Sequence, residues 1–563
     1  MQYPFQVPEV TISAFTETGQ EESSIIIPKQ RSYTGPERVI SSRLADTPCA
    51  TLGVQGLLNQ LNTTLGTSHS LDNPFLSSFL DGCITNGYDF GTAYSRLRGI
   101  RYTEGTVQDE LSRREEKDRE ERRKALVYNQ IVNTRLPPRR VWDLYSNRVV
   151  PYWVMDTDAE FELPRWPRPI SHAWVDENDR ANVWTPINGY EWPVPIPKDA
   201  NLNLIRIEML NLGEEYTWLD VLCLRQVGGQ REDLRAEEWK LDVPTIGRVY
   251  VATDNWDERI GEGFTLVCYL SGLGRPLTLK EGDLESDRSW FRRAWTLQEV
   301  GIESERVIAG DTPDGPLHAE CKDGKYETEL LTRFHEQLLS TDMAFDVREA
   351  LEEMRKRVST NPVDKIAGLA FLMDSATIPA YYESESLAQA RTALVNSMGG
   401  MYRAELFLLC PEPGNAGKKW RPSWEQAMKP LTTSKLNATI IGVDRDETTD
   451  EDWCHVKCIE GSVQGLAVVE EGDRRGVLIV KGEGGIEQFK ITAAHTYPIP
   501  EDTYTLIDTR TFTERIPLGF AWVVGRSLPK GTFEKVSMLQ MSGEEQRRLK
   551  DLGITEERRH ILI

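Results

Sequence analysis

The tryptophans of this chain are concentrated in one stretch, which must therefore hold most of the aromatic core. Eleven of the fifteen lie between Trp142 and Trp295, and each buried indole brings a large apolar surface into a core. Four runs in this stretch have the length and composition of buried strands, at 170–174, 216–224, 264–270 and 306–309. Helical patterns separate them, near 202–210, 237–250 and 289–300. This alternation predicts an α/β fold with a doubly wound parallel sheet.

The segments before this stretch differ from it in pattern. Residues 1–105 carry scattered Ser, Thr, Gly and Pro with short apolar patches, which indicates a loosely structured region. Residues 106–164 include the run DELSRREEKDREERRK, in which acids precede bases by four positions. That spacing favours a charged, solvated helix, followed by a lead-in to the main domain.

Beyond the main domain, two further regions are expected. Residues 336–433 are predicted to form a helical extension, in which Asp346 caps one helix and Ser386 begins another. From 434 to 563 the pattern changes to short β runs separated by turn residues, which predicts a mainly-β module. Near its end, Ser542 is expected to cap a helix that precedes the last strand.

Charge and cysteine content restrict the class of protein. The 563 residues carry a formal net charge of −22 at pH 7, which opposes binding to nucleic acid. No run of 18 apolar residues and no basic, apolar leader is present, so we expect neither a membrane span nor secretion. Eight cysteines are too few for a disulfide scaffold of this length. We therefore expect a reduced, cytoplasmic protein.

Several common functional motifs are missing. The Gly417–Lys418 pair in PEPGNAGKKW has Glu412 where a phosphate-binding P-loop needs glycine, and no Ser or Thr follows the lysine. Cys454 and Cys458 fall on one face of a predicted strand and His455 on the other, which is poor geometry for a metal. We expect two buried reduced cysteines there and no metal site.

Three segments in fixed order carry the strongest signal: ISHAW at 170–174, YTWLDVLCLRQ at 216–226 and WFRRAWTLQE at 290–299. They resemble the three motifs of the fungal heterokaryon-incompatibility (HET) domain, usually written LSYxWG, YxWIDxLCIxQ and WxxRxWTxQE. The NPVDKIAGL stretch at 361–369 is similar to the DKxYxLLG segment that often follows that domain. The resemblance spans about residues 165–375, with the domain itself placed at 165–335.

This sequence departs from the family pattern at a few positions. His172 stands for the usual Tyr, and Val175–Asp176 for the usual Gly. As a lone histidine in an apolar strand, His172 is expected to be a hydrogen-bonded structural residue rather than an acid or base. Pro244 interrupts the helix after the second motif and predicts a kink or an early helix end.

HET domains are regarded as distant relatives of TIR domains, so the resemblance implies a TIR-like, flavodoxin-like sheet. The third motif is similar to the SxWCxxE helix of NAD-cleaving TIR proteins, which makes Glu299 the catalytic candidate. On a helix, Phe291 and Trp295 would lie on the same face as Glu299 and could desolvate it. The resemblance also implies a set of NAD-binding residues: Ser171, Trp174, Asp220, Arg292, Arg293 and Trp295.

Two functions remain open at this stage. The first is a HET-domain protein of fungal nonself recognition and programmed cell death that cleaves NAD when clustered, with NAD as substrate and no cofactor. The second is a non-catalytic signalling adaptor that self-associates through the HET domain and binds an unknown protein partner. Glu299 could equally hold the motif in shape, and Asp220 could equally cap the following helix.

Overall fold

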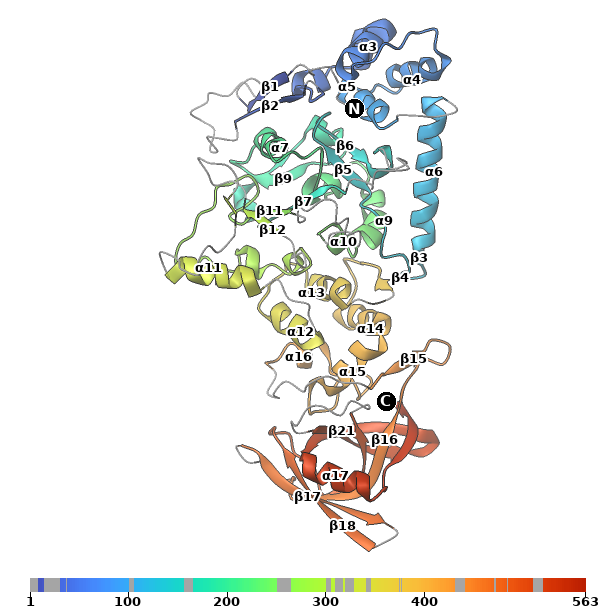
Figure 1. The fold of residues 1–563 in the computed structure, drawn as a ribbon, viewed down its shortest axis with the longest axis vertical. Helices are drawn as coiled ribbons and strands as arrows, with labels where there is room; N and C mark the ends of the chain where they lie inside the picture. Colours follow the sequence, from blue (N-terminus) through green and yellow to red (C-terminus); the bar gives the residue numbers. More distant parts are fainter. Residues whose placement is uncertain are drawn as a thin grey trace, which may run out of the picture. The chain divides into compact units, whose positions relative to one another are not determined.

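The computed structural model describes residues 9–14, 31–36, 38–100, 106–155, 166–250, 265–299, 305–308, 317–318, 329–340, 346–373, 375, 377–430, 441–469, 472–482, 485–509 and 520–563. The chain divides into two compact units, coloured blue to yellow and mostly orange to red in Figure 1. The first comprises Met1–Ala344, Arg357–Phe371 and Thr377–Ser384, and the second comprises Phe345–Lys356, Leu372–Ala376 and Glu385–Ile563. Among the described residues, no helix is both long and apolar enough to cross a bilayer. Phe264, Val300, Ala309 and Cys321 lie outside the described residues, so the ends of three predicted elements are not covered.

A seven-stranded sheet forms the centre of the first unit. Its strands, in spatial order, are β13 (Leu317–His318), β12 (Glu305–Ile308), β11 (Thr265–Tyr269), β7 (Arg168–His172), β10 (Tyr216–Leu219), β5 (Arg140–Asp143) and β6 (Arg148–Pro151). The four strands from β12 to β10 are parallel, whereas β13, β5 and β6 pair antiparallel. The sheet is therefore mixed, and the prediction of a purely parallel sheet is wrong at its edges. Asn147, with φ 55°, makes the tight turn that folds β6 back on β5.

The order of the parallel strands determines where a ligand site can form. Numbered along the chain, β7, β10, β11 and β12 lie in the spatial order 2-1-3-4. The chain moves from β7 to β10 in one direction and then returns past β7 to β11. At such a reversal the following loops separate and leave a crevice beyond the carboxyl ends of the strands.

Helices between these strands follow the sequence pattern in part. The helices are α7 (Leu202–Asn211), α8 (Asp220–Cys223), α9 (Glu232–Asp242) and α10 (Ile246–Tyr250). The helix predicted over 237–250 is interrupted near Pro244, which confirms the early end predicted from that proline. The strand predicted over 216–224 ends at Leu219, because the next four residues form the turn α8.

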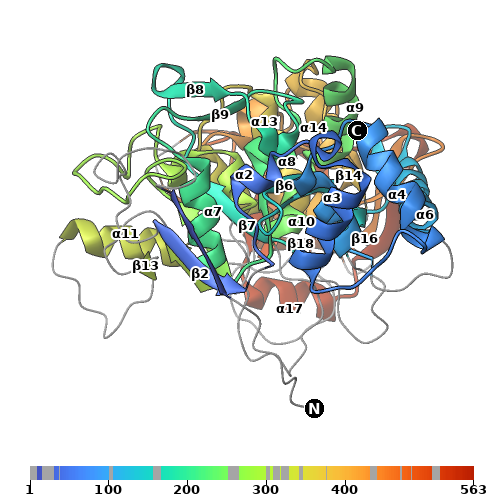
Figure 2. The same ribbon diagram turned by 90° about the horizontal axis from the view of Figure 1, so that it is seen from above.

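Residues 38–100 are folded rather than loosely structured, which corrects the prediction for that part of the N-terminal region. Four helices fill most of 38–100: α2 (Ser42–Ala45), α3 (Cys49–Leu65), α4 (Pro74–Thr85) and α5 (Phe90–Arg98). The side chains of Asn73 and Asp89 accept hydrogen bonds from the first turns of α4 and α5. Leu57, Phe79 and Tyr94 pack in one shared core. Figures 1 and 2 show α3 and α4 grouped with α6 at one side of this unit.

Helix α6 (Val107–Ala125) has the charge pairing expected from its sequence. Its acids and bases form the i,i+4 ion pairs Glu110–Arg114, Glu115–Arg119, Asp118–Arg122 and Glu120–Lys124. The helix is not solvated all round, because Arg114 is buried and donates to the carbonyl oxygens of Gly99 and Met155 at 3.1 Å. One face of α6 therefore belongs to the domain.

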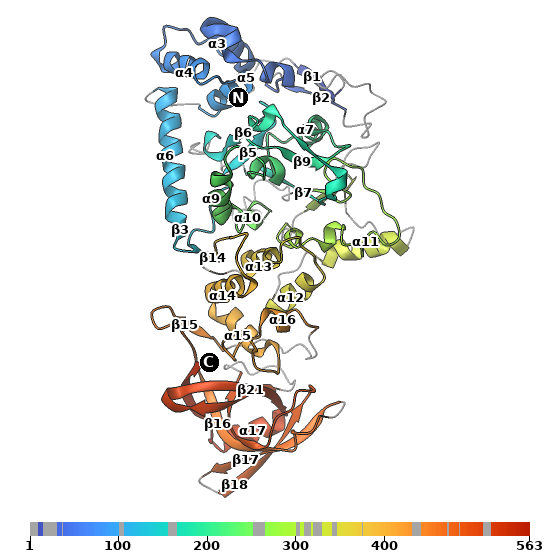
Figure 3. The same ribbon diagram turned by 180° about the vertical axis from the view of Figure 1, so that it is seen from behind.

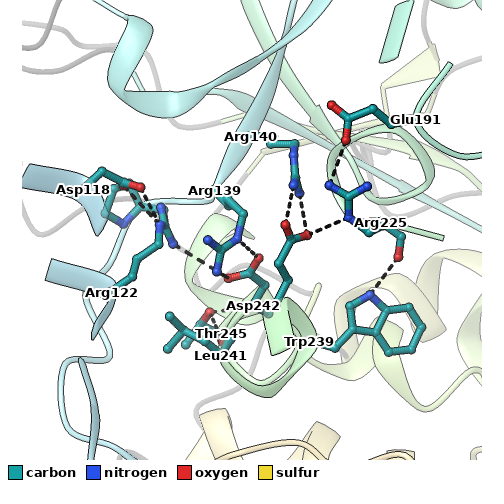
Figure 4. Close-up of polar contacts among 12 residues, drawn as sticks. Asp118, Arg122, Arg139, Arg140, Glu191, Arg225, Trp239, Leu241, Asp242 and Thr245 are labelled. Atoms are coloured by element: carbon teal, nitrogen blue, oxygen red, sulfur yellow. Dashed lines mark hydrogen bonds and ion pairs between the residues drawn. The ribbon is translucent and has the colours of Figure 1, made fainter. Parts of the chain in front are cut away.

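A row of arginines joins α6, β5 and α9 (Figure 4). Arg139 contacts Asp242 at 2.6 Å, and Asp242 also lies 3.8 Å from Arg122 of α6. The next residue, Arg140, begins β5 and forms a two-pronged contact with Glu238, at 2.6 and 3.0 Å. Such paired contacts fix orientation as well as distance, so α9 is held in register against the sheet.

The remaining elements of the first unit are short. They are β1 (Glu9–Ser13), β2 (Ser32–Pro36), β3 (Leu126–Val127), β4 (Gln130–Ile131), β8 (Arg180–Val183), β9 (Val194–Pro197), α11 (Glu329–Ser340), α13 (Val363–Ala370) and β14 (Ile378–Pro379). Strands β8 and β9 pair antiparallel directly after the first motif.

In the second unit, helices α12 and α14 to α16 precede an eight-stranded sheet, and α17 lies between its last two strands in the chain (Figure 3). The helices are α12 (Val347–Arg355), α14 (Leu387–Ser397), α15 (Gly400–Leu409), α16 (Trp424–Ala427) and α17 (Gly543–Asp551). The strands are β15 (Asp444–Asp446), β16 (Glu451–Gln464), β17 (Arg474–Gly482), β18 (Gly485–Ala493), β19 (Asp502–Asp508), β20 (Phe520–Leu528), β21 (Thr532–Met541) and β22 (Glu556–Leu562). Leu549 of α17 packs into the core of the sheet.

Several predictions for this region are confirmed. Asp346, Ser386 and Ser542 each accept a backbone hydrogen bond at the start of their helix. Cys454 and Cys458 are buried, free thiols on β16. The boundary placed at 433/434 falls inside one compact unit, however, because the helices and the sheet belong together.

Candidate functional site

The last residues of β7 begin the site. Ser171 and His172 are consecutive, so their side chains leave opposite faces of the strand, and each meets a different motif. Ser171 lies beside Cys268 of β11 in the sheet, and His172 lies beside Tyr269. Both residues therefore stand at the carboxyl end of the sheet, where the strand order reverses.

Ser171 connects the first motif to the third. Its hydroxyl donates a hydrogen bond to Glu299, and its oxygen accepts one from Trp290 Nε1 at 2.7 Å. Burial raises the pKa of the Glu299 carboxyl to about 7. The hydrogen bond from Ser171 opposes this rise and the charge of Asp220 adds to it, while His172 and Arg357 act to lower the pKa. Glu299 therefore keeps its proton to a higher pH than an exposed carboxyl does.

His172 connects the first motif to the second. Its Nε2 lies 2.8 Å from Asp220 Oδ1, and its Nδ1 lies 3.3 Å from the carbonyl oxygen of Ala173. Burial alone lowers the pKa of His172, but the charge of Asp220 and the hydrogen bond to it outweigh burial and raise the pKa above 6.5. Both ring nitrogens face acceptors, which favours the protonated imidazolium.

Asp220 is held by more than one donor. Its Oδ1 accepts from the backbone N–H of Val221 at 2.7 Å, and its Oδ2 accepts from Trp174 Nε1 at 3.2 Å. The Trp174 ring stacks on His172, with centroids 5.7 Å apart. Asp220 thus positions the histidine and tryptophan of the first motif while also starting α8.

Two arginines border this cluster. The Arg180 guanidinium lies 5.2 Å above the centre of the Trp174 ring, and its ion-pair partner Glu177 is 3.7 Å away and 92% exposed. The Arg293 guanidinium has no hydrogen bond or ion pair within the described part of the chain. Burial, and then repulsion from Arg180, lowers the pKa of Arg293. Positive charge is therefore available beside Glu299.

The third motif does not form the predicted helix over 289–300. Two short 3-10 turns, at Trp290–Arg292 and Trp295–Leu297, take its place. The backbone N–H of Ala294 donates to the carbonyl oxygen of Val358, and the Val358 N–H donates to the carbonyl oxygen of Arg292. These backbone groups of the third motif, which would bond within a helix, therefore bond to a distant segment of the chain instead. The proposed alignment of Phe291, Trp295 and Glu299 on one helical face is therefore wrong.

Residues from distant segments keep this motif in place. Arg357 donates to the Arg293 carbonyl at 2.9 Å and to Thr296 Oγ1 at 2.7 Å. The Gln298 side chain accepts from the Gly247 N–H at 3.1 Å and donates to the Ala367 carbonyl at 3.0 Å. These contacts fix the backbone on the N-terminal side of Glu299.

The structure brings together part of the predicted set. Ser171, Trp174 and Asp220 are linked to Glu299 or His172 by hydrogen bonds, and Arg293 is close enough for its charge to affect Glu299. Arg292 and Trp295 make no hydrogen bond or ring contact with these groups within the described residues. Arg292 instead pairs with Asp287 at 3.2 Å.

Trp295 belongs to a second polar group that the sequence did not single out. Its ring meets Tyr381 edge-on, with centroids 6.1 Å apart. The Tyr381 hydroxyl donates to Asp364 at 2.8 Å, and burial raises the pKa of Asp364 to about 6, although hydrogen bonds from Tyr381 and Trp295 oppose the rise. Asp364 lies in the NPVDKIAGL stretch, so that similarity was a usable signal, whereas nothing in the sequence marked Arg180 or Arg357.

Replacing Asp220 by Asn is expected to lower both stability and the His172 pKa. Asn keeps an oxygen that can accept from the Val221 N–H, but it has no negative charge. Its amide N–H₂ group would also face Trp174 or His172, where the carboxylate now accepts a hydrogen bond. The free energy of unfolding should therefore fall by about 1–3 kcal/mol. Urea unfolding and NMR titration of labelled histidines would measure the two effects. Asp176→Asn, which affects a partly exposed pair with Arg288, is the control. An unchanged His172 pKa would contradict the positioning role of Asp220.

Comparisons with known proteins give no independent indication of what this chain does. No family model, no curated protein and no solved structure matches this chain.

Proposed function

We propose that this chain is a HET-domain protein of nonself recognition and regulated cell death, whose cluster around Glu299 cleaves the nicotinamide–ribose bond of NAD when the protein is clustered. One observation carries the proposal. Ser171, Asp220 and Glu299 come from three separate motifs and form two hydrogen-bonded pairs at the carboxyl end of the sheet, Ser171 with Glu299 and His172 with Asp220. The pairs are close enough for the charges of Asp220 and His172 to act on Glu299. Convergence of polar groups at such a position is typical of ligand sites in open α/β sheets.

The strand order supports a TIR-like core. Flavodoxin-like sheets begin 2-1-3-4, as these parallel strands do, and bind their ligand where strands 1 and 3 meet. In this chain those strands are β7 and β11. A nucleotide in that crevice would lie beside Ser171 and His172.

The proposed reaction needs few groups. The C–N bond to nicotinamide breaks with its electron pair leaving on the neutral nicotinamide, so no proton donor is required. The ribose becomes an oxocarbenium-like cation, which the Glu299 carboxylate stabilises. Water then adds to that carbon and releases one proton. Arg180 and Arg293 would bind the pyrophosphate, and the Trp174 ring would contact the substrate.

The pH profile tests the ionisation state of Glu299. If the carboxylate is the active form, the rate of nicotinamide release should rise about tenfold per unit up to pH 7, the pKa to which burial raises Glu299, and then level off. Initial rates between about pH 5.5 and 8.5 would measure the profile. A rate that falls above pH 7 would instead indicate a general acid and contradict the proposed role.

The activity itself is tested on the full chain. Purified protein, free and crowded on beads, is incubated with NAD, and nicotinamide is quantified by chromatography. We expect release that increases with crowding. No release in either form would reject the enzymatic function.

A specific observation favours the non-catalytic adaptor as the second candidate. Glu299 and Asp220 already accept hydrogen bonds from the protein's own Ser171, Trp174 and Val221. Such a cluster can hold three motifs together without a substrate. The adaptor predicts concentration-dependent self-association by light scattering that is unaffected by Glu299→Gln, with no NAD consumed.

A further inference from the structure

Two buried arginines in the second unit lack partners. Arg391 lies on α14, and Arg421 lies in the turn before α16; each is 7% exposed. Arg391 Nη2 and Arg421 Nε and Nη1 are buried with no hydrogen-bond partner among the described residues. Neither guanidinium takes part in an ion pair there. Burying an unpaired charge is costly, so two in one place require an explanation.

The two guanidiniums are close enough to repel each other. Burial, and then the charge of Arg421, lowers the pKa of Arg391 to about 10. Arg421 is similarly affected by burial and then by Arg445. Arg421 also lies over the Trp420 ring at 5.8 Å, and Arg403 lies over the same ring at 5.5 Å. Arg403 and Arg421 therefore lie over Trp420, and Arg391 is near enough to feel the charge of Arg421.

Nearby carboxylates are already occupied. Asp452 is fully buried and accepts hydrogen bonds from Arg403, from Lys418 Nζ at 2.7 Å and from Trp420 Nε1 at 3.0 Å. Asp450 pairs with Arg445 at 2.5 Å. These carboxylates thus already pair with Arg403, Lys418 and Arg445. No carboxylate raises the pKa of Arg391.

Arg474 of this unit shows how carbonyl oxygens can stabilise a buried guanidinium, although its Nε also lacks a hydrogen-bond partner among the described residues. Arg474 is 5% exposed and donates to the carbonyl oxygens of Leu466, Val468, His495 and Tyr497 at 2.5–3.2 Å. Arg391 and Arg421 have no such carbonyl partners within the described part of the chain. Burial alone therefore does not explain why the Arg391 and Arg421 guanidiniums have no hydrogen-bond partners among the described residues.

We propose that Arg391 and Arg421 bind the phosphate group of a small molecule. A phosphate monoester carries nearly two negative charges at neutral pH, which matches two unpaired guanidiniums, and its oxygens fit the donor fork of arginine. Because both side chains are more than nine-tenths buried, the group that reaches them must be small. The site is independent of the cluster around Glu299, since all its residues belong to the second unit.

Calorimetric titration of the full chain tests the proposal. The probes are inorganic phosphate, glycerol 3-phosphate and AMP, each at matched ionic strength. We expect one site per chain, and Arg391→Met and Arg421→Met should each weaken binding by roughly 10- to 100-fold, the effect of losing a charge-assisted contact. The probe that binds most tightly distinguishes free phosphate from a monoester.

Stability without phosphate supplies an independent readout. Arg391→Met removes an unpaired buried charge, so its melting temperature in phosphate-free buffer should equal or exceed that of the parent. The matched control, Arg474→Met, removes a guanidinium that donates to four carbonyl oxygens and should melt lower in any buffer. If one variant does not fold, the other variant and the parent titration decide. The proposal is overturned if the parent binds no probe at about 10 mM, or if folded variants bind as the parent does.

Discussion

Replacement of Glu299 by Gln is expected to reduce release of nicotinamide from NAD by about 100-fold or more, while the protein remains folded. Gln keeps the size of the side chain and an oxygen that can accept from Ser171. It cannot supply the negative charge that stabilises the cationic ribose. Steady-state rates at saturating NAD, with the protein crowded on beads, would measure the loss. Glu116→Gln, at a 68% exposed carboxylate of α6, is the control and should keep the parent rate.

The same substitution should not destabilise the fold above neutral pH. Burial raises the pKa of Glu299 to about 7 from an ordinary value of 4.5, so between these values the folded chain binds more protons than the unfolded chain. Stability contributed by this group is therefore lost as the pH rises from about 4.5 to about 7. That loss is on the order of 3 kcal/mol, at about 1.4 kcal/mol per pKa unit. Urea unfolding at pH 8 should find Glu299→Gln at least as stable as the parent. A clearly less stable variant would assign Glu299 a structural role.

The largest loss of stability is expected from Asp452→Asn in the second unit. Asp452 is fully buried, and its carboxylate is the acceptor for Arg403, Lys418 and Trp420. Asn has nearly the same shape but no charge, so Arg403 and Lys418 would remain buried or half-buried without an anion. Removing one partner of a buried ion pair costs about 3–5 kcal/mol.

Denaturant unfolding of the full chain, followed by tryptophan fluorescence, would measure this loss. The exposed Asp473→Asn is the control and should change stability by less than about 0.5 kcal/mol. An effect of Asp452→Asn as small as that would show that the buried cations find other partners. In that case a different explanation would be needed for how the positive charges of Arg403 and Arg421 beside Trp420 are stabilised.

Local patterns predicted the central strands well, because buried parallel strands are short apolar runs that can be read directly. The segments at 170–174, 264–270 and 306–309 correspond to β7, β11 and β12 within two residues at each described end. The edge strands β5 and β6 were missed, since RVWD and RVVP are only four residues long and partly polar.

The errors arise where distant residues determine the structure. The WFRRAWTLQE segment has a helical pattern, but Arg357 and Val358 take its backbone groups, and no local signal reveals them. Helices α2–α5 were missed because their apolar residues are divided among short segments, whose common core exists only after they pack. In the candidate site, motif similarity identified Ser171, Asp220 and Glu299, whereas Arg180 became visible only in three dimensions.

The two units are interleaved along the chain, which has a practical consequence. Arg357–Phe371 belongs to the first unit but is covalently joined at both ends to segments of the second. A fragment ending at residue 344 would contain all three motifs and yet lack Arg357 and Ala367, which hold the third motif. Activity lost by such a fragment would say nothing about Glu299. Both ends of this segment continue directly into the second unit, so the chain joins the residues that hold the third motif covalently to that unit.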